Sequence, residues 1–448
     1  MINIFDKITD QSYALAKKGD PLFGAVSISG AKNMVTKIMT ACLLAKKGKL
    51  IIRNVPFIGE VFITLRLFDQ LGVNYKLNAD KTLEIEPQSF RSSKVKFEGN
   101  DGNRISLLLA GPVLAQFGEA TIAKPKGCKI GLRKIDFHIQ GLEKFGTEIK
   151  ETNEFLFMKL GPQGLKGTQF RLPFPSVGAT ENLLITAVSA KGESIIDNCA
   201  VEPEIIELVK FLQGAGVEIT LNGDRSIRVQ GAENINLSEF TVIPDRVETV
   251  SLAAAALATK GDVFLKDAKQ DLIVTFLGLL EKMGAGIEIK ENGIRIFYKQ
   301  SLKPISIATE VYPGLVTDFQ QPLAILLSQV QGISHIHETI FEKRFDYLEL
   351  LNPLIKNNKK FAISDQCPKG QECRFSGQGH LHFAEINGPI ELGAGQIAIC
   401  DLRAGFALLT AGLLSDGLKI NNLKLLFRGY EDPIGKLKSL GADIELKI

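Results

Sequence analysis

Six short polar strings carry most of the residues in this sequence that could do chemistry, and each begins a strongly apolar stretch. They are GAKN (30–33), NDGNR (100–104), SVGATEN (176–182), PDRVET (244–249), TDFQQ (317–321) and DLRAG (401–405). Ser, Thr, Asp and Asn are ordinary helix N-caps, and Ser176 and Thr317 fit that role. Capping does not explain the cations in the same strings, because a cation near a helix N-terminus opposes the helix dipole. These cations are Lys32, Arg104, Arg246 and Arg403.

A helix N-terminus with a cation beside it is a site for phosphate or carboxylate. We therefore expect the six helix starts to line one anion-binding cleft between two domains. The string Phe427-Arg428-Gly429-Tyr430 adds another arginine before the last predicted helix, although alone it establishes little.

A separate basic loop surrounds Cys128. The loop reads Lys124-Pro-Lys-Gly-Cys128-Lys-Ile-Gly131-Leu-Arg133. A cysteine in a long chain is more often a buried, inert residue. Here the neighbouring Lys126, Lys129 and Arg133 favour the thiolate, so we interpret Cys128 as a reactive cysteine.

The elements that must position these residues form a repeat that occurs six times. Each unit opens with a glycine that follows a helix and precedes a strand, at Gly48, Gly118, Gly192, Gly261, Gly332 and Gly417. The helix before each glycine is apolar on nearly every face, which predicts that it lies inside a domain, surrounded by sheet. Strings such as FDQLGVNYKL and EKMGAGIEIK place a glycine at a helix end, so we interpret them as C-caps and not as dinucleotide fingerprints.

The repeats predict an α/β fold of two similar domains, each with three βαβαββ-type repeats around buried helices. The chain ends one helix and one hairpin strand short of a sixth full repeat. We therefore expect the N-terminal strand, at 25–29, to complete the C-terminal domain. The predicted first domain is 1–31 plus 244–448, and the second is 32–243, which carries the Cys128 loop.

Composition excludes several classes of protein. The chain has 448 residues, 45% of them hydrophobic, and a net charge of +3 without a basic stripe, which argues against nucleic-acid binding. No apolar segment resembles a signal peptide or a membrane span. The six cysteines have no disulfide-like spacing, which is typical of reduced thiols. We expect a cytoplasmic enzyme with small-molecule substrates, no nucleic acid, no membrane and no obligate protein partner.

The chain resembles the UDP-N-acetylglucosamine 1-carboxyvinyltransferase family in six motifs that occur in the family's order. They are Gly30-Ala-Lys-Asn33, Gly127-Cys128-x-Ile-Gly-x-Arg133, Ser176-Val-Gly-Ala-Thr180, Pro244-Asp-Arg246, Asp401-Leu-Arg-Ala-Gly405 and Arg428-Gly-Tyr430. The likeness covers about residues 24–446. It implies the enolpyruvyl transferase fold, an inside-out α/β barrel in each of two domains with the cleft between them. It also implies the family's reaction, which moves the enolpyruvyl group of phosphoenolpyruvate to the 3-hydroxyl of UDP-N-acetylglucosamine, releases phosphate and begins peptidoglycan synthesis.

The resemblance also implies residue roles. Cys128 matches the lid cysteine that protonates the enol methylene, forms an adduct with phosphoenolpyruvate and is the target of fosfomycin, an epoxide analogue of that substrate. Asp318 matches the general base, and Lys32 and Arg403 complete the catalytic set. The residues implied to bind phosphoenolpyruvate are Lys32, Asn33, Arg133, Arg403 and Arg428. Those implied to bind UDP-N-acetylglucosamine are Asn33, Arg104, Arg133, Lys134, Ile135, Asp136, Phe137, Ser176, Val177, Gly178, Asp318 and Ile340.

Three features depart from the family pattern. Lys134 stands where proline is common, and Phe174 stands where some members carry lysine. The segment 354–376 is longer than usual and contains Cys367 and Cys373, followed by His380 and His382. This spacing fits no tight zinc-ligand pattern, so we expect a surface excursion, no metal and no cofactor.

Two alternative functions remain at this point. The shikimate-pathway enolpyruvyl transferase resembles this fold, but Ala31-Lys32-Asn33 and Cys128 argue against it. The other alternative is a catalytically silent paralogue that binds the UDP-sugar and regulates the pathway, although every catalytic position is occupied.

Overall fold

The computed structural model describes residues 4–97, 102–125, 131 and 134–448. These residues form two compact units. Unit 1 contains residues 4–29, 131 and 244–448, and unit 2 contains residues 30–97, 102–125 and 134–243. No helix among the described residues is both long enough and apolar enough to cross a membrane.

Unit 1 contains three four-stranded sheets with one strand order. In each sheet two neighbouring strands are parallel, and an antiparallel pair extends the sheet from the second of them. The first sheet is β2 (Phe23–Ser27), β15 (Asp262–Lys266), β17 (Gly293–Phe297) and β16 (Gly286–Lys290). The second is β18 (Ser306–Ala308), β19 (Gly332–His337), β21 (Phe383–Gly388) and β20 (Phe361–Ser364). The third is β22 (Gly395–Ala398), β23 (Leu418–Asn421), β1 (Tyr13–Ala16) and β24 (Ile444–Lys447).

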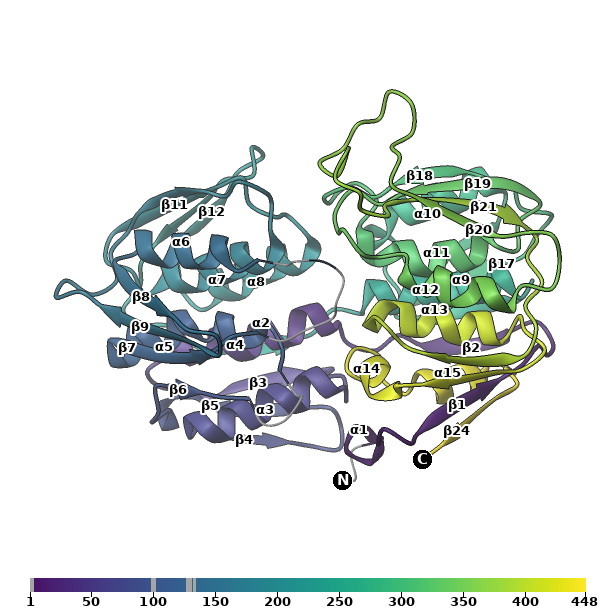
Figure 1. The fold of residues 1–448 in the computed structure, drawn as a ribbon. Helices are drawn as coiled ribbons and strands as arrows, with labels where there is room; N and C mark the ends of the chain where they lie inside the picture. Colours follow the sequence, from purple (N-terminus) through teal and green to yellow (C-terminus); the bar gives the residue numbers. More distant parts are fainter. Residues whose placement is uncertain (1–3, 98–101, 126–130, 132–133) are drawn as a thin grey trace. The chain divides into compact units, whose positions relative to one another are not determined.

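Three helices form the interior of unit 1. They are α9 (Arg246–Ala258), α11 (Gln320–Leu327) and α13 (Leu402–Gly412), which pack against one another inside the sheets (Figure 1). Every residue of these three helices is buried, as their all-round apolar pattern predicted. The other helices are α1 (Ile4–Lys7), η3 (Gln270–Leu272), α10 (Val274–Met283), η4 (Thr317–Phe319), α12 (Asp346–Leu351), η5 (Asn352–Leu354), α14 (Leu423–Phe427) and α15 (Pro433–Ser439).

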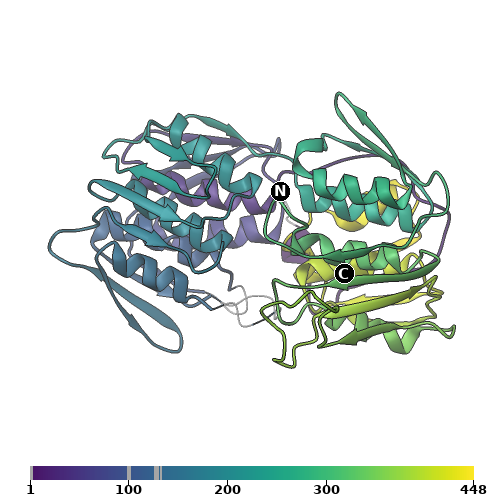
Figure 2. The same cartoon turned by 90° about the horizontal axis from the view of Figure 1, so that it is seen from above.

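Unit 2 repeats this plan, with helices enclosed by strands when seen from above (Figure 2). Its first sheet is β14 (Glu239–Thr241), β3 (Leu50–Arg53), β5 (Leu83–Glu86) and β4 (Asn74–Leu77). Its second sheet is β6 (Lys94–Val95), β7 (Glu119–Ala123), β9 (Phe155–Leu160) and β8 (Thr147–Glu151). Its third sheet is β10 (Gln169–Arg171), β11 (Glu193–Asp197), β13 (Ile227–Gln230) and β12 (Ile219–Leu221). Its helices are α2 (Lys32–Ala41), η1 (Cys42–Leu44), α3 (Gly59–Leu71), η2 (Pro87–Ser89), α4 (Ile105–Leu108), α5 (Ala110–Phe117), α6 (Asp136–Lys144), α7 (Val177–Val188) and α8 (Pro203–Gly214). The six sheets with one strand order confirm the six repeats read from the sequence.

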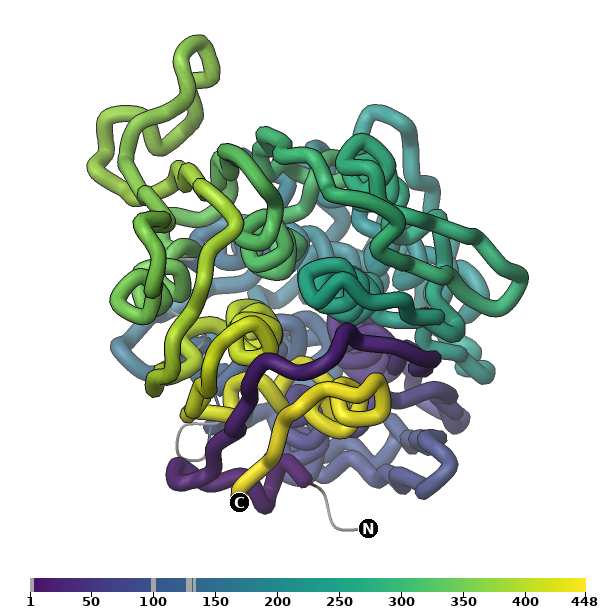
Figure 3. The backbone as a smooth tube through the Cα atoms, turned by 90° about the vertical axis from the view of Figure 1, so that its right-hand side faces the viewer, coloured from purple at the N-terminus to yellow at the C-terminus, as the bar shows by residue number. Residues whose placement is uncertain are grey.

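The N-terminal strand that completes the last sheet is β1, which lies between β23 and β24. The N- and C-terminal strands are therefore neighbours (Figure 3). The strand predicted at 25–29 does join the C-terminal part of the chain, because it overlaps β2, which pairs in parallel with β15 of unit 1. The strand of the last sheet is a second, earlier one that the sequence reading did not identify. The sequence of β1, YALA, has only small buried side chains at Ala14 and Ala16, so its strand pattern was weak.

The glycines after the outer helices act as C-caps, as predicted. Gly72 ends α3 with φ 74° and Gly284 ends α10 with φ 91°, both in the left-handed region that favours glycine. These glycines therefore end helices, which agrees with the C-cap interpretation of the strings.

Candidate active site

The described residues of the six polar strings lie at the starts of buried helices, as predicted. Lys32 is the first residue of α2, and Arg246 is the first residue of α9. Arg104 is the N-cap of α4, and Arg403 is the second residue of α13. The predicted placement of cations at helix N-termini is confirmed for these four residues.

Asp318 lies between two buried arginines in unit 1. Its Oδ1 accepts a hydrogen bond from Arg344 Nη2 at 2.9 Å, and its Oδ2 accepts one from Arg403 Nε at 3.0 Å. Arg344 Nη1 also donates to Thr317 Oγ1 at 2.7 Å. Because Asp318 belongs to η4 and Arg403 to α13, this carboxylate joins the starts of two of the three buried helices.

Both arginines remain charged despite their burial. Burial acts to lower the pKa of Arg403, but the charge of Asp318 and then the phenol oxygen of Tyr430 outweigh it and raise that pKa. Burial likewise acts to lower the pKa of Arg344, which Asp318, Asp401 and then Glu338 raise on balance. The site therefore holds two permanent, desolvated cations, which suit an anionic ligand.

Thr317 does not cap the helix, contrary to the prediction. The N-cap of η4 is Val316, and Thr317 Oγ1 donates to Glu338 Oε2 at 2.8 Å. The other carboxylate oxygen of Glu338 accepts from the backbone nitrogens of Ile340 and Phe341, at 2.9 and 3.1 Å. Glu338 is fully buried, and burial raises its pKa. This network links the predicted sugar-contact residue Ile340 to the Asp318 site.

The ring of Tyr430 packs against the guanidinium of Arg403. The guanidinium carbon lies 5.4 Å from the centre of the Tyr430 ring, and the Tyr430 hydroxyl lies 3.0 Å from Ser251 Oγ on α9. Burial raises the pKa of Tyr430 to about 12. Arg428, two residues earlier, is the partly exposed C-cap of α14.

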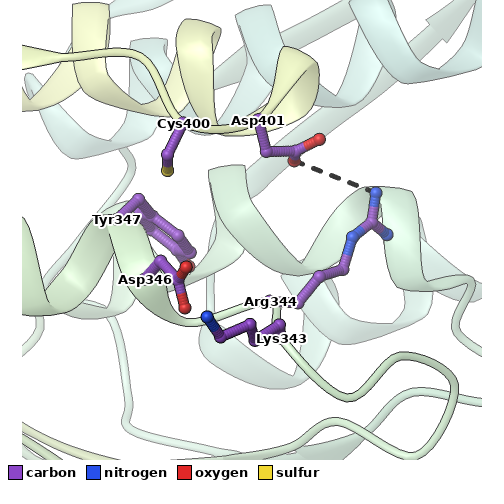
Figure 4. A pocket seen from close by; sticks show the side chains of 6 residues that line it. All are labelled: Lys343, Arg344, Asp346, Tyr347, Cys400 and Asp401. Carbon is purple, nitrogen blue, oxygen red and sulfur yellow. Dashed lines mark ion pairs between the residues drawn. The ribbon is translucent and has the colours of Figure 1, made fainter. Parts of the chain in front are cut away.

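A small pocket borders this network (Figure 4). It is lined by Lys343, Arg344, Asp346, Tyr347, Cys400 and Asp401. Asp401 caps α13 by accepting from Ala404 N at 3.2 Å, and its Oδ2 lies 3.9 Å from Arg344 Nη2. Burial raises the pKa of Cys400 to about 12, so this thiol is not an activated nucleophile.

In unit 2, the described site residues also lie at helix starts. Asn33 follows Lys32 in the first turn of α2, and Ser176 caps α7 by accepting from Ala179 N at 3.4 Å. Val177 and Gly178 form the first turn of α7. Asp136 and Phe137 begin α6, with Lys134 and Ile135 just before it, and Phe174 lies ahead of Ser176. Cys128, the predicted lid cysteine, and Arg133, a predicted anion ligand, lie outside the described residues.

Two functional candidates were missed by the sequence reading. Arg344 lies in the string FEKRFD, where a lone arginine has no pattern that separates it from a surface residue. Glu181 lies on α7 with Lys37 Nζ at 3.8 Å, and burial raises its pKa to about 7 although Lys37 opposes the shift. A glutamate inside the otherwise apolar α7 was the available signal for Glu181.

The chain is similar to known proteins over nearly its whole length. Residues 16–437 match the family model described as EPSP synthase (3-phosphoshikimate 1-carboxyvinyltransferase). The chain is 41% identical to UDP-N-acetylglucosamine 1-carboxyvinyltransferase of Protochlamydia amoebophila, over 96% of this chain and 93% of the relative. It is 42% identical to the protein of that name from Chlamydia abortus, over 96% of each chain.

Solved structures show the same fold at lower identity. The enolpyruvyl transferase NikO from Streptomyces tendae matches with a TM-score of 0.83 and 19% identity, over 97% of this chain and 99% of NikO. EPSP synthase from Acinetobacter baumannii matches with a TM-score of 0.72 and 17% identity, over 98% of this chain and all of that chain. The fold is thus that of the enolpyruvyl transferases, and the near full-length relatives show that this chain belongs to the UDP-N-acetylglucosamine 1-carboxyvinyltransferase family.

Proposed function

We propose that this chain transfers the enolpyruvyl group of phosphoenolpyruvate to the 3-hydroxyl of UDP-N-acetylglucosamine, releasing phosphate, in the cytoplasm as the first committed step of peptidoglycan synthesis. The observation that carries the proposal is Asp318, held between Arg344 and Arg403 where two buried helices begin. A carboxylate among fixed cations combines a proton acceptor with binding groups for an anionic substrate.

In this reaction Asp318 accepts the proton of the sugar 3-hydroxyl as its oxygen bonds to C2 of phosphoenolpyruvate. Cys128 supplies a proton to the methylene carbon. Loss of phosphate, together with a proton from the same carbon, then restores the double bond. The phosphate and carboxylate of phosphoenolpyruvate are held by Lys32, Asn33, Arg133, Arg403 and Arg428.

The nucleotide sugar would bind mainly to unit 2, through the helix starts of α4, α6 and α7. The proposed contacts are Asn33, Arg104, Arg133, Lys134, Ile135, Asp136, Phe137, Ser176, Val177 and Gly178, with Asp318 and Ile340 from unit 1. In support, the N-cap of α7 is Ser176 and α6 begins at Asp136, which leaves backbone N–H groups available for an anion. Units 1 and 2 would act as the two domains of the enzyme.

A substrate assay tests the proposal directly. We expect phosphate release from phosphoenolpyruvate with UDP-N-acetylglucosamine and none with shikimate 3-phosphate, followed with a coupled phosphate assay. Release with shikimate 3-phosphate alone would identify the chain as the other enolpyruvyl transferase. Tight binding of the UDP-sugar without turnover would identify a silent paralogue.

Replacement of Arg344 by Met should lower turnover about 100-fold, because Asp318 would lose one of its two guanidinium donors and shift from its reactive position. It should also lower the free energy of unfolding by about 3–5 kcal/mol, since one member of a buried charge pair is removed. Arg344→Lys keeps the charge and should recover part of both losses. Steady-state kinetics and urea unfolding measure the two effects, and turnover unchanged in Arg344→Met would contradict the positioning role.

A further inference from the structure

Four metal-ligating side chains converge beside the segment that joins β20 to β21. This segment projects from unit 1 in green in Figures 1 and 3. His337, Cys367, Cys373 and His382 each place one ligand atom within 4.8 Å of the other three. The sequence reading expected no metal here. It considered only the local string of two cysteines and two histidines, whereas the structure replaces His380 with His337 from the end of β19.

Two of the distances between ligand atoms are close to those of tetrahedral coordination, and all of them are within 4.8 Å. Cys367 Sγ lies 3.5 Å from Cys373 Sγ and 3.2 Å from His382 Nε2. Bond lengths of about 2.3 Å to sulfur and about 2.0–2.1 Å to nitrogen place the ligand atoms of a zinc tetrahedron roughly 3.3–3.8 Å apart. The two sulfurs are too far apart for a disulfide, which requires about 2.05 Å.

The histidines are oriented as metal ligands. His382 Nδ1 lies 2.6 Å from the carbonyl oxygen of His380, so Nδ1 carries the proton and donates it. Nε2 then directs its lone pair towards Cys367, in the arrangement by which an outer hydrogen bond orients a ligating histidine. His337 is 3% exposed, and its Nε2 has no hydrogen-bond partner among the described residues. A buried polar atom of this kind requires an explanation, and a metal ion provides one.

The sulfurs also have outer contacts that favour thiolates. Ser376 Oγ lies 3.1 Å from Cys367 Sγ, and the backbone N–H of Phe375 donates to Cys373 Sγ at 3.3 Å. Such hydrogen bonds to sulfur stabilise negative charge and orient the ligands.

The segment has almost no core of its own. Between residues 365 and 382, only Phe375 and His382 are buried. Loops of this length without regular structure are uncommon in compact domains unless something else holds them. A metal ion that joins three residues of this segment, Cys367, Cys373 and His382, to His337 of β19 would act as that cross-link.

We propose that His337, Cys367, Cys373 and His382 bind one zinc ion in a closed tetrahedral site. Two thiolates and two neutral imidazoles are a donor set that selects zinc, and four protein ligands leave no open position for a substrate. The ion is therefore structural, and it holds the β20–β21 segment to the end of β19.

The site adjoins the loop that contains Ile340. Glu338 follows His337, its backbone N–H donates to the His382 carbonyl at 2.7 Å, and its carboxylate holds Ile340 N. Arg374, next to Cys373, donates to the Ile340 carbonyl. Loss of zinc should therefore raise the KM for the nucleotide sugar more than it lowers kcat. This consequence rests on the proposed function, whereas zinc binding does not.

The test measures metal content and coordination in the full chain, purified under reducing conditions. After dialysis, elemental analysis should find about one zinc per chain. Cobalt(II) exchanged into the protein should give the thiolate charge-transfer and intense ligand-field absorption of a tetrahedral sulfur site. The Cys367→Ser/Cys373→Ser variant should lose both signals. His335→Gln is the matched control, because His335 lies on the same strand but bonds to Ser306 and should leave both signals unchanged.

Limited proteolysis adds a local readout that does not depend on a variant. Removal of the metal from the unmodified chain with a chelator should speed cleavage within 365–382, and added zinc should reverse this. Reduced protein that retains no zinc, or another metal in its place, would overturn the proposal. Zinc retained by the double cysteine variant, or an octahedral cobalt spectrum, would also overturn it. If turnover fails while zinc binding holds, only the proposed function is rejected.

Discussion

Asp318→Asn should lower turnover by about two to four orders of magnitude, the usual contribution of a general base. An amide cannot accept the proton of the sugar hydroxyl, while its size leaves space for the substrate unchanged. The substitution should also cost one hydrogen bond, because the amide nitrogen would face a guanidinium donor of either Arg344 or Arg403 and cannot accept from it. Initial rates of phosphate release, with calorimetric binding of UDP-N-acetylglucosamine, separate the loss of chemistry from the loss of binding.

Asp401→Asn is the matched control for this variant. It also removes a negative charge near Arg344, yet asparagine is as good an N-cap as aspartate for α13. We expect its turnover to stay within about tenfold of the original. If Asp318→Asn were as active as this control, Asp318 would not be the base.

Fosfomycin should modify Cys128 and abolish activity. By family resemblance, its phosphonate would be held by the phosphoenolpyruvate ligands Lys32, Arg133 and Arg403. Attack of the thiolate on the epoxide then becomes effectively intramolecular. Burial raises the pKa of Cys199 to about 12 and that of Cys42 even further, so neither competes as a thiolate. Mass spectrometry of peptides after treatment, with and without UDP-N-acetylglucosamine, identifies the modified residue.

Cys128→Asp should retain activity and resist the drug, because a carboxyl group carries a proton but is a poor nucleophile towards the epoxide. Cys367, Cys373 and Cys400 are the partly exposed thiols among the described cysteines. Burial raises the pKa of Cys400 to about 12, and bound zinc should protect Cys367 and Cys373. Their alkylation by iodoacetamide only after metal removal is the internal control. An adduct on Cys42, Cys199 or Cys400 with Cys128 unmodified would contradict the lid role.

Much of the fold could be predicted because it depends on local patterns in the sequence. All-round apolar helices such as α9 and α13 indicated burial, and the glycines after α3 and α10 indicated helix ends. The strand at Tyr13–Ala16 was not recognised in the sequence for the opposite reason. Strand β1 is short and its buried residues are small, so only its pairing with β23 and β24 defines it.

The sequence by itself determined the repeat, the buried helices and the cations at their starts, because each depends on neighbouring residues in one element. Only the tertiary structure decided which side chains meet. Arg344 and Arg403 are far apart in the chain from Asp318, yet both donate to its carboxylate. His337 joins Cys367, Cys373 and His382 only because β19 pairs with β21, which His382 directly precedes. Spacing along a chain reports ligands that share one element, whereas sheet pairing and helix packing bring together ligands that do not.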